Sequence, residues 1–180
     1  MTAGRKNLIV FAVMAISGLF GCAPPAQDRP PLRTVPHVDL QRYLGTWYEI
    51  ARFPHRFQTG CVETRAVYTL RDDGLIGVHN ECRKGSVDGP LKAAEGRARV
   101  IDRVTNAKLE VSFFWPFWGD YWIIDLDPDY HWAVVGHPSR KYLWVLCREQ
   151  TLDAVVLSGI WRRLEQQGYE LSNLIIAQPG

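Results

Sequence analysis

Short runs in which apolar and polar residues alternate recur along the chain after residue 40, with turn signals between them. Such runs are typical of half-buried strands, and many short strands in succession predict an antiparallel barrel or sandwich. Asp72-Asp73-Gly74 favours a tight hairpin, and Pro128 and Pro138 favour turns that proline initiates. The pattern predicts eight strands, at 46–53, 62–71, 75–84, 93–101, 107–114, 119–126, 131–137 and 142–149.

The alternation also indicates which side chains face the interior. Within 107–114, the apolar residues Leu109, Val111 and Phe113 alternate with polar ones. Within 93–101, the residues that alternate with charged ones are small, Gly96 and Ala98 among them. Small inward residues on one strand beside large ones on the next favour a barrel with room inside. A sandwich with a filled core is the alternative that the pattern leaves open.

One segment has the periodicity of a helix instead. Leu152, Val155, Val156, Ile160 and Leu164 are spaced to form one apolar stripe on an amphipathic helix. Gly168 is expected to stop the helix, and a short last strand is predicted at 174–177.

The N-terminal segment has the pattern of a signal peptide followed by a lipid-attachment site. Arg5 and Lys6 precede the apolar run Leu8–Phe20, which predicts a secretory signal peptide at residues 1–21. The run leads into Gly21-Cys22 and resembles the bacterial lipobox, whose cysteine is acylated and becomes the new N-terminus. Cys22 is therefore the expected lipidation site. An ordinary signal peptide with a nearby cysteine is the alternative.

Residues 22–37 are expected to form an acylated, proline-rich tether, because proline favours extended backbone and large apolar residues are few there. Two or more acyl chains hold a protein stably on a membrane. The residue after the cysteine, Ala23, is not an aspartate. By the sorting rule known for Gram-negative lipoproteins, this implies the outer membrane. Residues 38–180 are then the folded domain, on the periplasmic side.

Composition narrows the classes of function. The chain of 180 residues contains seven each of Trp, Tyr and Phe, which indicates a crowded core or a cavity for a flat or greasy ligand. Once Arg5 and Lys6 are removed, 19 of the 21 basic residues remain against 19 acidic ones. With no excess of basic residues, the mature chain lacks the positive charge typical of nucleic-acid-binding proteins. No later run approaches the ~20 apolar residues of a membrane span.

Three motifs carry a resemblance to a known family. Gly45-Thr46-Trp47, Asp129-Tyr130 and Arg148 resemble, in order and spacing, the three motifs of the lipocalins. The stretch 43–54 resembles the bacterial and apolipoprotein D-like branch, and the resemblance covers residues 38–178. It implies an all-β fold, an eight-stranded antiparallel up-and-down β-barrel with one C-terminal α-helix and a short ninth strand.

Strand order predicts where these motifs lie, because alternate connections of an up-and-down barrel lie at alternate ends. Trp47, the 127–130 turn and Arg148 fall at one end, where a guanidinium over the indole face would contribute ~0.5–2 kcal/mol. This end is expected to be a structural floor, made of Gly45, Trp47, Asp129, Tyr130 and Arg148.

The other end is expected to be the barrel mouth, with Phe53, Phe57, Trp115, Phe117 and Trp118 on its rim. Three aromatic residues in one short loop should be buried or functional, because large exposed apolar patches are rare on monomers. The functional interpretation is the rim of a lipid entrance that faces a membrane or a ligand. Packing of the loop on its own barrel, or in a homodimer, is the alternative.

The cysteines and histidines offer little chemistry. The hairpin turn at 72–74 brings Cys61 and Cys82 together, so a disulfide is plausible if a bulge adjusts the register. Cys147 is then a small buried residue. The five histidines show no metal-ligand spacing, so neither a metal nor a cofactor is expected. Some relatives in the family are enzymes that use a cysteine at the barrel mouth, so catalysis on a lipid or isoprenoid through Cys61 is the alternative function.

The leading hypothesis is a membrane-anchored, non-enzymatic lipocalin that binds a fatty acid or lysophospholipid in the bacterial envelope. A reactive Cys61 would favour the enzyme, and a Cys61–Cys82 disulfide would argue against it. A structural envelope lipoprotein with a filled barrel is a third class. The candidate ligand-binding residues are Tyr68, Val78, Asn80, Ala98, Val111, Phe113, Trp122 and Trp144.

Overall fold

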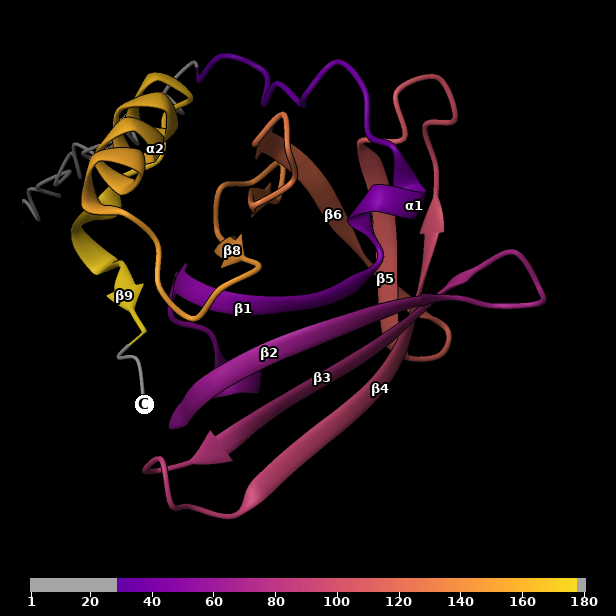
Figure 1. Ribbon diagram of the computed structural model, residues 1–180. Coiled ribbons are helices and arrows are strands. Elements are labelled where there is room, and N and C mark those ends of the chain that lie inside the picture. The colour runs from indigo at the N-terminus through magenta and orange to yellow at the C-terminus, as the bar shows by residue number, and fades with distance from the viewer. Residues whose placement is uncertain (1–28, 178–180) are drawn as a thin grey trace, which may run out of the picture.

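A computed structural model describes residues 29–177, so Cys22 and the expected signal peptide lie outside the described residues. Eight antiparallel strands close into a barrel, and a ninth strand and one long helix lie against its outside (Figure 1). The strands are β1 (Gly45–Arg52), β2 (Cys61–Leu70), β3 (Ile76–Lys84), β4 (Leu91–Val100), β5 (Lys108–Phe114), β6 (Phe117–Leu126), β7 (Trp132–Gly136), β8 (Leu143–Cys147) and β9 (Ile175–Ile176).

Each strand from β1 to β7 pairs with the next along the chain, and β1 closes the barrel by pairing with both β2 and β8. The predicted barrel is confirmed, and each of its eight strands begins and ends within two residues of its expected position. Alternation locates strands this well because each strand of a barrel has one face inside and one outside.

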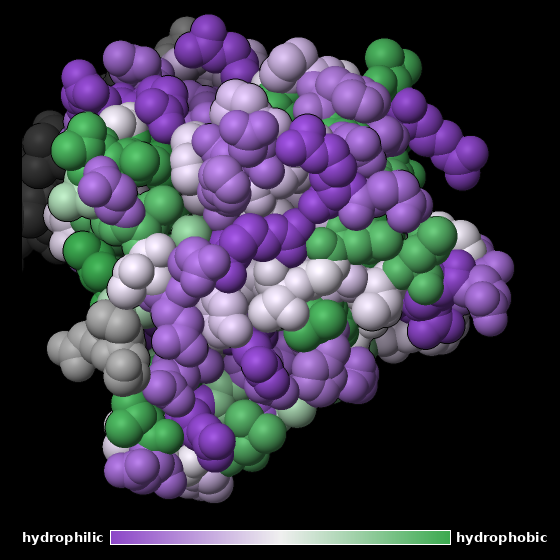
Figure 2. Space-filling model, in the orientation of Figure 1, coloured by the Kyte–Doolittle hydropathy of each residue, from purple (hydrophilic) through white to green (hydrophobic). Residues whose placement is uncertain are grey.

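Two apolar cores form on the two faces of the wall. Inside the barrel, Ala133, Val135 and Leu146 belong to one buried cluster. Outside, Val134 and Val145 pack with Ile160 and other residues of α2 (Ala154–Gln166) in a second cluster. Strands β7 and β8 are therefore buried on both faces, whereas polar side chains cover much of the wall around β2 to β4 (Figure 2).

Helix α2 begins and ends where its sequence indicates. The Asp153 carboxylate accepts hydrogen bonds from the first-turn amides, and Gly168 adopts a φ of +80° just beyond the last turn. The stripe that packs on the barrel contains Val156, Ile160 and Leu164. Val155 is 78% exposed, so its expected place on the stripe is wrong. It lies one residue, about 100°, away from Val156 around the helix.

The segment before β1 packs against the barrel instead of forming a free tether. Leu32 is buried against the outer core, and the Val35 amide donates to the Ile123 carbonyl. Two residues of the short helix α1 (Leu40–Tyr43) reach the inner core. The expected tether is thus wrong from residue 29 onward, because these apolar side chains find partners on the barrel.

The floor is closed by one arginine. The Arg148 guanidinium lies 3.7 Å from the ring centre of Trp47, and it donates to the carbonyls of Arg42, Leu44 and Thr46 at 2.7 to 2.9 Å. Trp47 is fully buried, and its indole N–H donates to the Tyr43 carbonyl at 2.8 Å. The cation–π contact expected from strand order is therefore present.

The other floor motifs contribute unequally. Gly45 has a φ of +91°, which favours glycine at this entry to β1. The Tyr130 hydroxyl accepts the Asp39 amide at 2.7 Å. The Asp129 side chain is exposed, and its carboxylate comes no closer than 4.0 Å to the Arg42 guanidinium. It therefore contributes little to the floor. The Asp127 carboxylate holds the turn instead, because it accepts the amides of residues 129 and 131.

Candidate functional site

A buried ion pair lies inside the barrel, just below its mouth. Arg52 Nη1 donates to Glu49 Oε1 at 2.9 Å, and the two residues are only 6% and 5% exposed. They lie opposite Trp144 and Leu146, whose side chains belong to the inner core. A bulge in β1 between residues 49 and 51 lets both charged side chains point inward.

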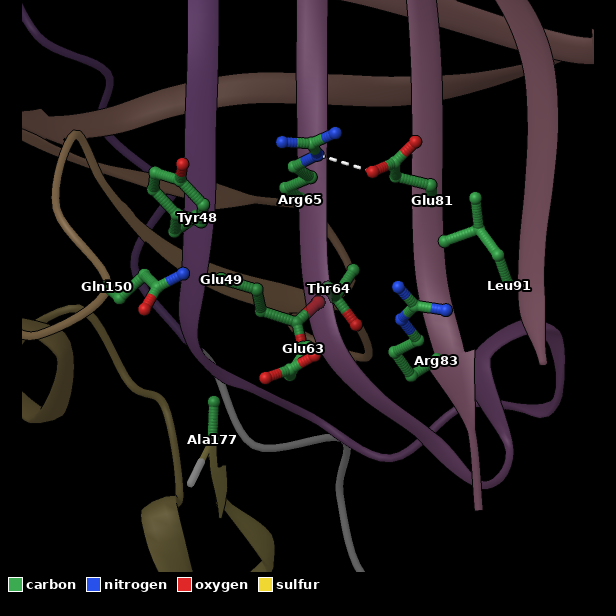
Figure 3. A pocket seen from close by; sticks show the side chains of 10 residues that line it. All are labelled: Tyr48, Glu49, Glu63, Thr64, Arg65, Glu81, Arg83, Leu91, Gln150 and Ala177. Atoms are coloured by element: carbon green, nitrogen blue, oxygen red, sulfur yellow. Dashed lines mark hydrogen bonds and ion pairs between the residues drawn. The ribbon is translucent and has the colours of Figure 1, made fainter. Parts of the chain in front are cut away.

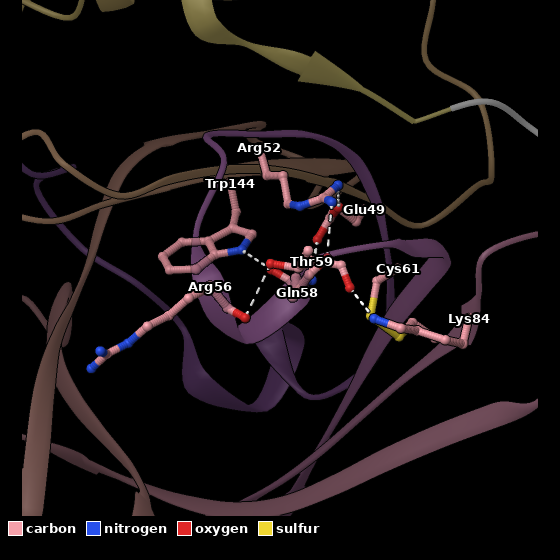
Figure 4. Close-up of a disulfide and its surroundings, with 9 residues drawn as sticks. Glu49, Arg52, Arg56, Gln58, Thr59, Cys61, Lys84 and Trp144 are labelled. Atoms are coloured by element: carbon pink, nitrogen blue, oxygen red, sulfur yellow. Dashed lines mark hydrogen bonds and ion pairs between the residues drawn. A yellow bond between two sulfur atoms is a disulfide. The ribbon is translucent and has the colours of Figure 1, made fainter.

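A short 3-10 helix, η1 (Arg56–Gln58), closes the mouth above this pair. The Gln58 amide donates to Glu49 Oε2 at 2.7 Å and accepts from the Trp144 indole at 3.0 Å (Figure 4). The Arg52 guanidinium donates to the Gln58 carbonyl at 3.3 Å. The segment 54–60 is therefore a lid, and Gln58 holds it to the charged pair.

Burial dominates the electrostatics beneath the lid. It raises the pKa of the Glu49 carboxyl, more than the neighbouring Arg52 charge and the Gln58 hydrogen bond lower it. Burial likewise lowers the pKa of His55, which lies edge-on to the Trp144 ring with 5.3 Å between ring centres. A polar group placed here would interact strongly because little water screens it.

The half of the interior nearer the floor is apolar apart from three phenols. The Tyr121 hydroxyl is 2.8 Å from that of Tyr43 and 2.9 Å from that of Tyr68. Burial raises the pKa of Tyr68 to about 12, so this phenol stays neutral at physiological pH. A small space of about 10 Å³ remains among these rings and the apolar residues that include Val78, Ala98 and Val111.

Most of the predicted ligand-binding residues lie inside the barrel. Tyr68, Val78, Ala98 and Val111 line the space just described. Asn80 follows Val78 on the inner face of β3, and its buried Oδ1 has no hydrogen-bond partner among the described residues. Phe113 packs against the inner core, and its ring lies where a side chain on Gly96 would be. Trp144 lies under the lid.

Trp122 is a wrong candidate, because it faces outward. Its ring packs against the outer core with Lys108 Nζ 4.5 Å from its centre, and its indole donates to Asp120 at 3.2 Å. The neighbouring residues Tyr121 and Ile123 point inward. One position along a strand changes the face.

The predicted rim is only partly present. Phe57, Trp115 and Phe117 are exposed at this end, the last two at 75% each, together with the unpredicted Phe114. Phe53 is wrong as a rim residue, because its ring is buried against the Tyr169 ring, 5.9 Å away between ring centres.

Trp118 is also wrong as a rim residue. Its ring lies on the outer wall, where the guanidinium carbon of Arg99 is 4.3 Å from the ring centre and that of Arg97 is 5.6 Å away. Both arginines alternate with inward residues of β4 such as Ala98. Trp118 therefore covers an outward-facing charged row rather than the entrance.

The predicted disulfide between Cys61 and Cys82 is present beside the lid (Figure 4). A bulge between Val62 and Arg65 adjusts the register opposite Cys82, as the spacing required. Lys84 Nζ donates to the Thr59 carbonyl and ties the lid to β3. Cys147 is buried with a free thiol.

Within residues 29–177, no cluster of three or more His, Cys, Asp or Glu could hold a metal ion. In the same range, no helix is long and apolar enough to cross a membrane.

A closed eight-stranded barrel has an interior that is either filled by side chains or holds one small ligand. The family model of the lipocalin-like domain matches residues 38–179. The chain belongs to this lipocalin-like family.

Relatives and solved structures agree with this assignment. The chain is 40% identical over 173 residues to Outer membrane lipoprotein Blc of Escherichia coli (strain K12), covering 96% of this chain and 97% of that one. It is 29% identical over 182 residues to Apolipoprotein D of Macaca fascicularis, covering 94% of each. Insecticyanin from the tobacco hornworm Manduca sexta has the same fold, with a TM-score of 0.68 at 19% identity over 83% of this chain and 85% of that one.

Sequence reasoning missed Arg52, Gln58 and the pairing of Glu49. Glu49 points inward near the mouth, and its partners are Arg52 and Gln58. The signal in the sequence is a pair of charged residues within an otherwise apolar first strand.

Proposed function

We propose that the chain binds a fatty acid or a lysophospholipid inside its barrel, and that it stores or transfers this ligand in the bacterial cell envelope. The observation that carries the proposal is the division of the interior, apolar towards the floor and charged beneath the lid. An acyl tail would contact residues such as Val78 and Val111, and a polar head would meet Arg52 and Gln58. Apolar burial supplies affinity and a few polar groups supply orientation.

Ligand entry requires the lid to open and the side chains of the lower interior to move apart. With the lid closed, the lower interior has about 10 Å³ free, which is room for about one water molecule. Gln58 holds the lid through three hydrogen bonds, two of which end on the charged pair. A ligand head group that bonds to Arg52 would replace the Gln58 carbonyl and leave the lid free to move.

We place this activity at the outer membrane, on its periplasmic side. The relatives named outer membrane lipoprotein support this location, and so does the sequence around Cys22. Acyl chains on Cys22 would hold the protein at the membrane.

The described chain begins beside the mouth end of the barrel. Arg140, in the loop before β8, donates to the Pro30 carbonyl, and the start of β8 lies beside the end of β1. The seven residues 22–28 span at most roughly 25 Å. The exposed Trp115 and Phe117 at this end would then contact the lipid surface, where aromatic rings are favoured.

We propose binding rather than catalysis because the candidate catalytic thiol, that of Cys61, is part of a disulfide. Cys61 is bonded to Cys82, and a disulfide offers no thiolate. Burial raises the pKa of the Cys147 thiol, which keeps it protonated.

Titration with amphiphiles of increasing chain length tests the proposal. Each methylene that enters the barrel should raise the affinity about four-fold, from ~0.8 kcal/mol per group, until the interior is full. Tryptophan fluorescence of the mature protein is the readout, with short soluble acids as a control. Affinity that does not depend on chain length would refute an internal tail site.

The rim is tested with two matched double variants. Trp115→Ala with Phe117→Ala should weaken binding to lipid vesicles and leave the melting temperature almost unchanged, because both rings are exposed. The control, Ile101→Ala with Val104→Ala, removes exposed apolar side chains at the floor end. Equal vesicle binding by both variants would contradict the orientation.

A further inference from the structure

The outer side of the lid carries groups that the barrel does not use. Gln58 points towards the interior, whereas the Arg56 and Phe57 side chains of the same short helix are exposed to solvent. The Arg56 guanidinium lies 5.1 Å from the centre of the Phe57 ring and forms no hydrogen bond or ion pair with a described residue. Figure 4 draws it pointing away from Gln58. The lid therefore has one face bonded to the barrel and one face without a partner.

Other connections at the mouth add exposed apolar side chains. The β3–β4 loop exposes Val87, and the β5–β6 hairpin exposes Phe114, Trp115 and Phe117. These connections share an end with the lid because alternate connections of an up-and-down barrel lie at the same end. Apolar surface gathered in this way marks an interaction site rather than a random exposure.

Charge is distributed unevenly between the two ends of the barrel. The four connections at the mouth that join strands β1 to β8 contain three basic residues, Arg56, Arg140 and Lys141, against one acidic residue, Asp88. The three connections at the floor contain two basic residues and five aspartates. An anionic surface would therefore attract the mouth and repel the floor.

The basic groups at the mouth differ from those on the outer wall, which have acidic partners. On the wall, Arg65 bonds to Glu81 (Figure 3), and Arg99 lies 2.6 Å from Glu110. The Lys141 ammonium at the mouth, by contrast, has no acidic partner within the described part of the chain. Unpaired cations beside exposed aromatic rings fit a partner that offers both anions and apolar depth, and an anionic bilayer offers both.

The start of the described chain points to the same partner. The Arg140 guanidinium donates to the Pro30 carbonyl, so the chain enters the fold beside the mouth. Acyl chains on Cys22 would hold this end close to the bilayer that contains them, because residues 22–28 span at most roughly 25 Å.

We infer that the mouth end docks on an anionic phospholipid bilayer and that the lid is part of the contact, so that docking opens the lid. The Phe57 ring enters the interface, and the Arg56 and Lys141 cations lie among the lipid phosphates. In water the lid stays closed, because only its inner contacts, through Gln58, have partners. A bilayer shifts the lid only if it binds the open form more tightly. An open lid meets this condition, since it is free to carry Arg56 and Phe57 deeper.

This inference rests on the proposed function and adds the place and the trigger of ligand exchange. The ligand passes between barrel and bilayer when the two are in contact, and not through the water between them.

Vesicle binding tests the docking. The protein is the oxidised mature chain with Cys22→Ser, which has no acyl chains, and the vesicles are phosphatidylcholine alone or mixed with phosphatidylglycerol. Arg56→Gln and Lys141→Gln should each weaken binding to the mixed vesicles about five-fold, from ~1 kcal/mol per basic residue at an anionic surface. Arg56→Lys should bind like the wild type.

Arg103→Gln is the matched control, because it removes the same charge from an exposed residue at the floor end. It should bind the mixed vesicles like the wild type. An equal loss for Arg103→Gln, or equal wild-type binding to both kinds of vesicle, would overturn the inference.

Transfer of a fluorescent fatty acid from the protein to acceptor vesicles tests the opening of the lid. The transfer rate should rise with the concentration of the mixed vesicles and not with that of phosphatidylcholine vesicles. When vesicles are in such excess that all protein is bound, Lys141→Gln should regain the wild-type rate. Arg56→Gln should stay slow, because its residue lies on the lid and Lys141 does not.

A rate that is independent of vesicle concentration and composition would mean diffusion through water. It would overturn the inference and leave the proposed function intact, as would equal rates for the two variants in excess vesicles. A wild-type protein that binds no fatty acid or lysophospholipid in solution would overturn the proposed function, and the vesicle-binding series would still decide whether the mouth docks.

Discussion

Replacement of Trp47 by alanine tests whether the floor is structural. The side chain is fully buried, its N–H is bonded to the Tyr43 carbonyl, and the Arg148 guanidinium lies on its face. Trp47 is not among the residues that line the lower interior space. The substitution should therefore remove stability and leave the ligand site almost unchanged.

The magnitude follows from these contacts. Truncation of a buried aromatic residue costs about 3–5 kcal/mol, which includes the cavity left behind. Loss of the hydrogen bond adds ~1 kcal/mol, and loss of the cation–π contact adds ~0.5–2 kcal/mol. Because such terms overlap, we expect a total near 5 kcal/mol, against a typical domain stability of 5–15 kcal/mol. The melting temperature should fall by roughly 10–20 °C in a protein of this size.

The assay is urea unfolding of the oxidised mature protein, followed by circular dichroism, with Trp47→Phe as the matched control. Phenylalanine keeps a ring in the floor but removes the N–H, so it should cost about 1–2 kcal/mol. Affinity for palmitate should stay within a few-fold in both variants under conditions where they are folded. A Trp47→Ala protein that keeps its stability but loses binding would refute the structural role of the floor. It would show that Trp47 belongs to the ligand site.

Three other predictions concern the anchor, the lid and the buried charge. Cys22→Ser should release a soluble protein or leave an uncleaved precursor in cell fractionation, and normal membrane attachment would contradict lipidation. Gln58→Ala should speed palmitate association in stopped-flow fluorescence, because it loosens the lid; an unchanged rate would argue against the latch. Burial raises the pKa of Glu49 above its ordinary value of 4.5, so its contribution to stability is present below that pH and is lost as pH rises through the folded-state value. The unfolding free energy of the wild type minus that of Glu49→Gln should fall accordingly, whereas a constant difference would be inconsistent.

The strands were predictable because a barrel wall imposes a period of two on most of them, and the exceptions have a physical cause. Residues 121–124 of β6 are all large and apolar, since one face meets the interior and the other meets α2. Without polar positions between them, the sequence cannot show which face Trp122 occupies. Helix α1, at four residues, is too short to display a helical period.

The floor was predictable for a different reason. Strand order brings its residues to one end of the barrel, and the family motifs identify them in the sequence. The mouth was less predictable because it is built from connections, whose side chains have no period. Phe53 directly follows β1 and packs outward on Tyr169, whereas Phe57 lies on the lid and is exposed.

The charged pair beneath the lid could not be derived from alternation at all. Strict alternation puts Glu49 and Ala51 on one face of β1 and Arg52 on the other. The bulge at residues 49–51 changes that count, so Glu49 and Arg52 face the same interior. A bulge of this kind depends on pairing with β8, which no local pattern in β1 records.

The arginine of this pair and the arginine of the floor have different partners. Buried ion pairs are often no more stabilising than apolar residues of the same size, so stability alone does not explain charges at this point. The floor, by contrast, uses Arg148 to satisfy backbone carbonyls that would otherwise lack donors. Glu49 bonds both to Arg52 and, through Gln58, to the lid. One carboxylate thus joins the lid to the charged pair, and a ligand that entered by the mouth would meet it.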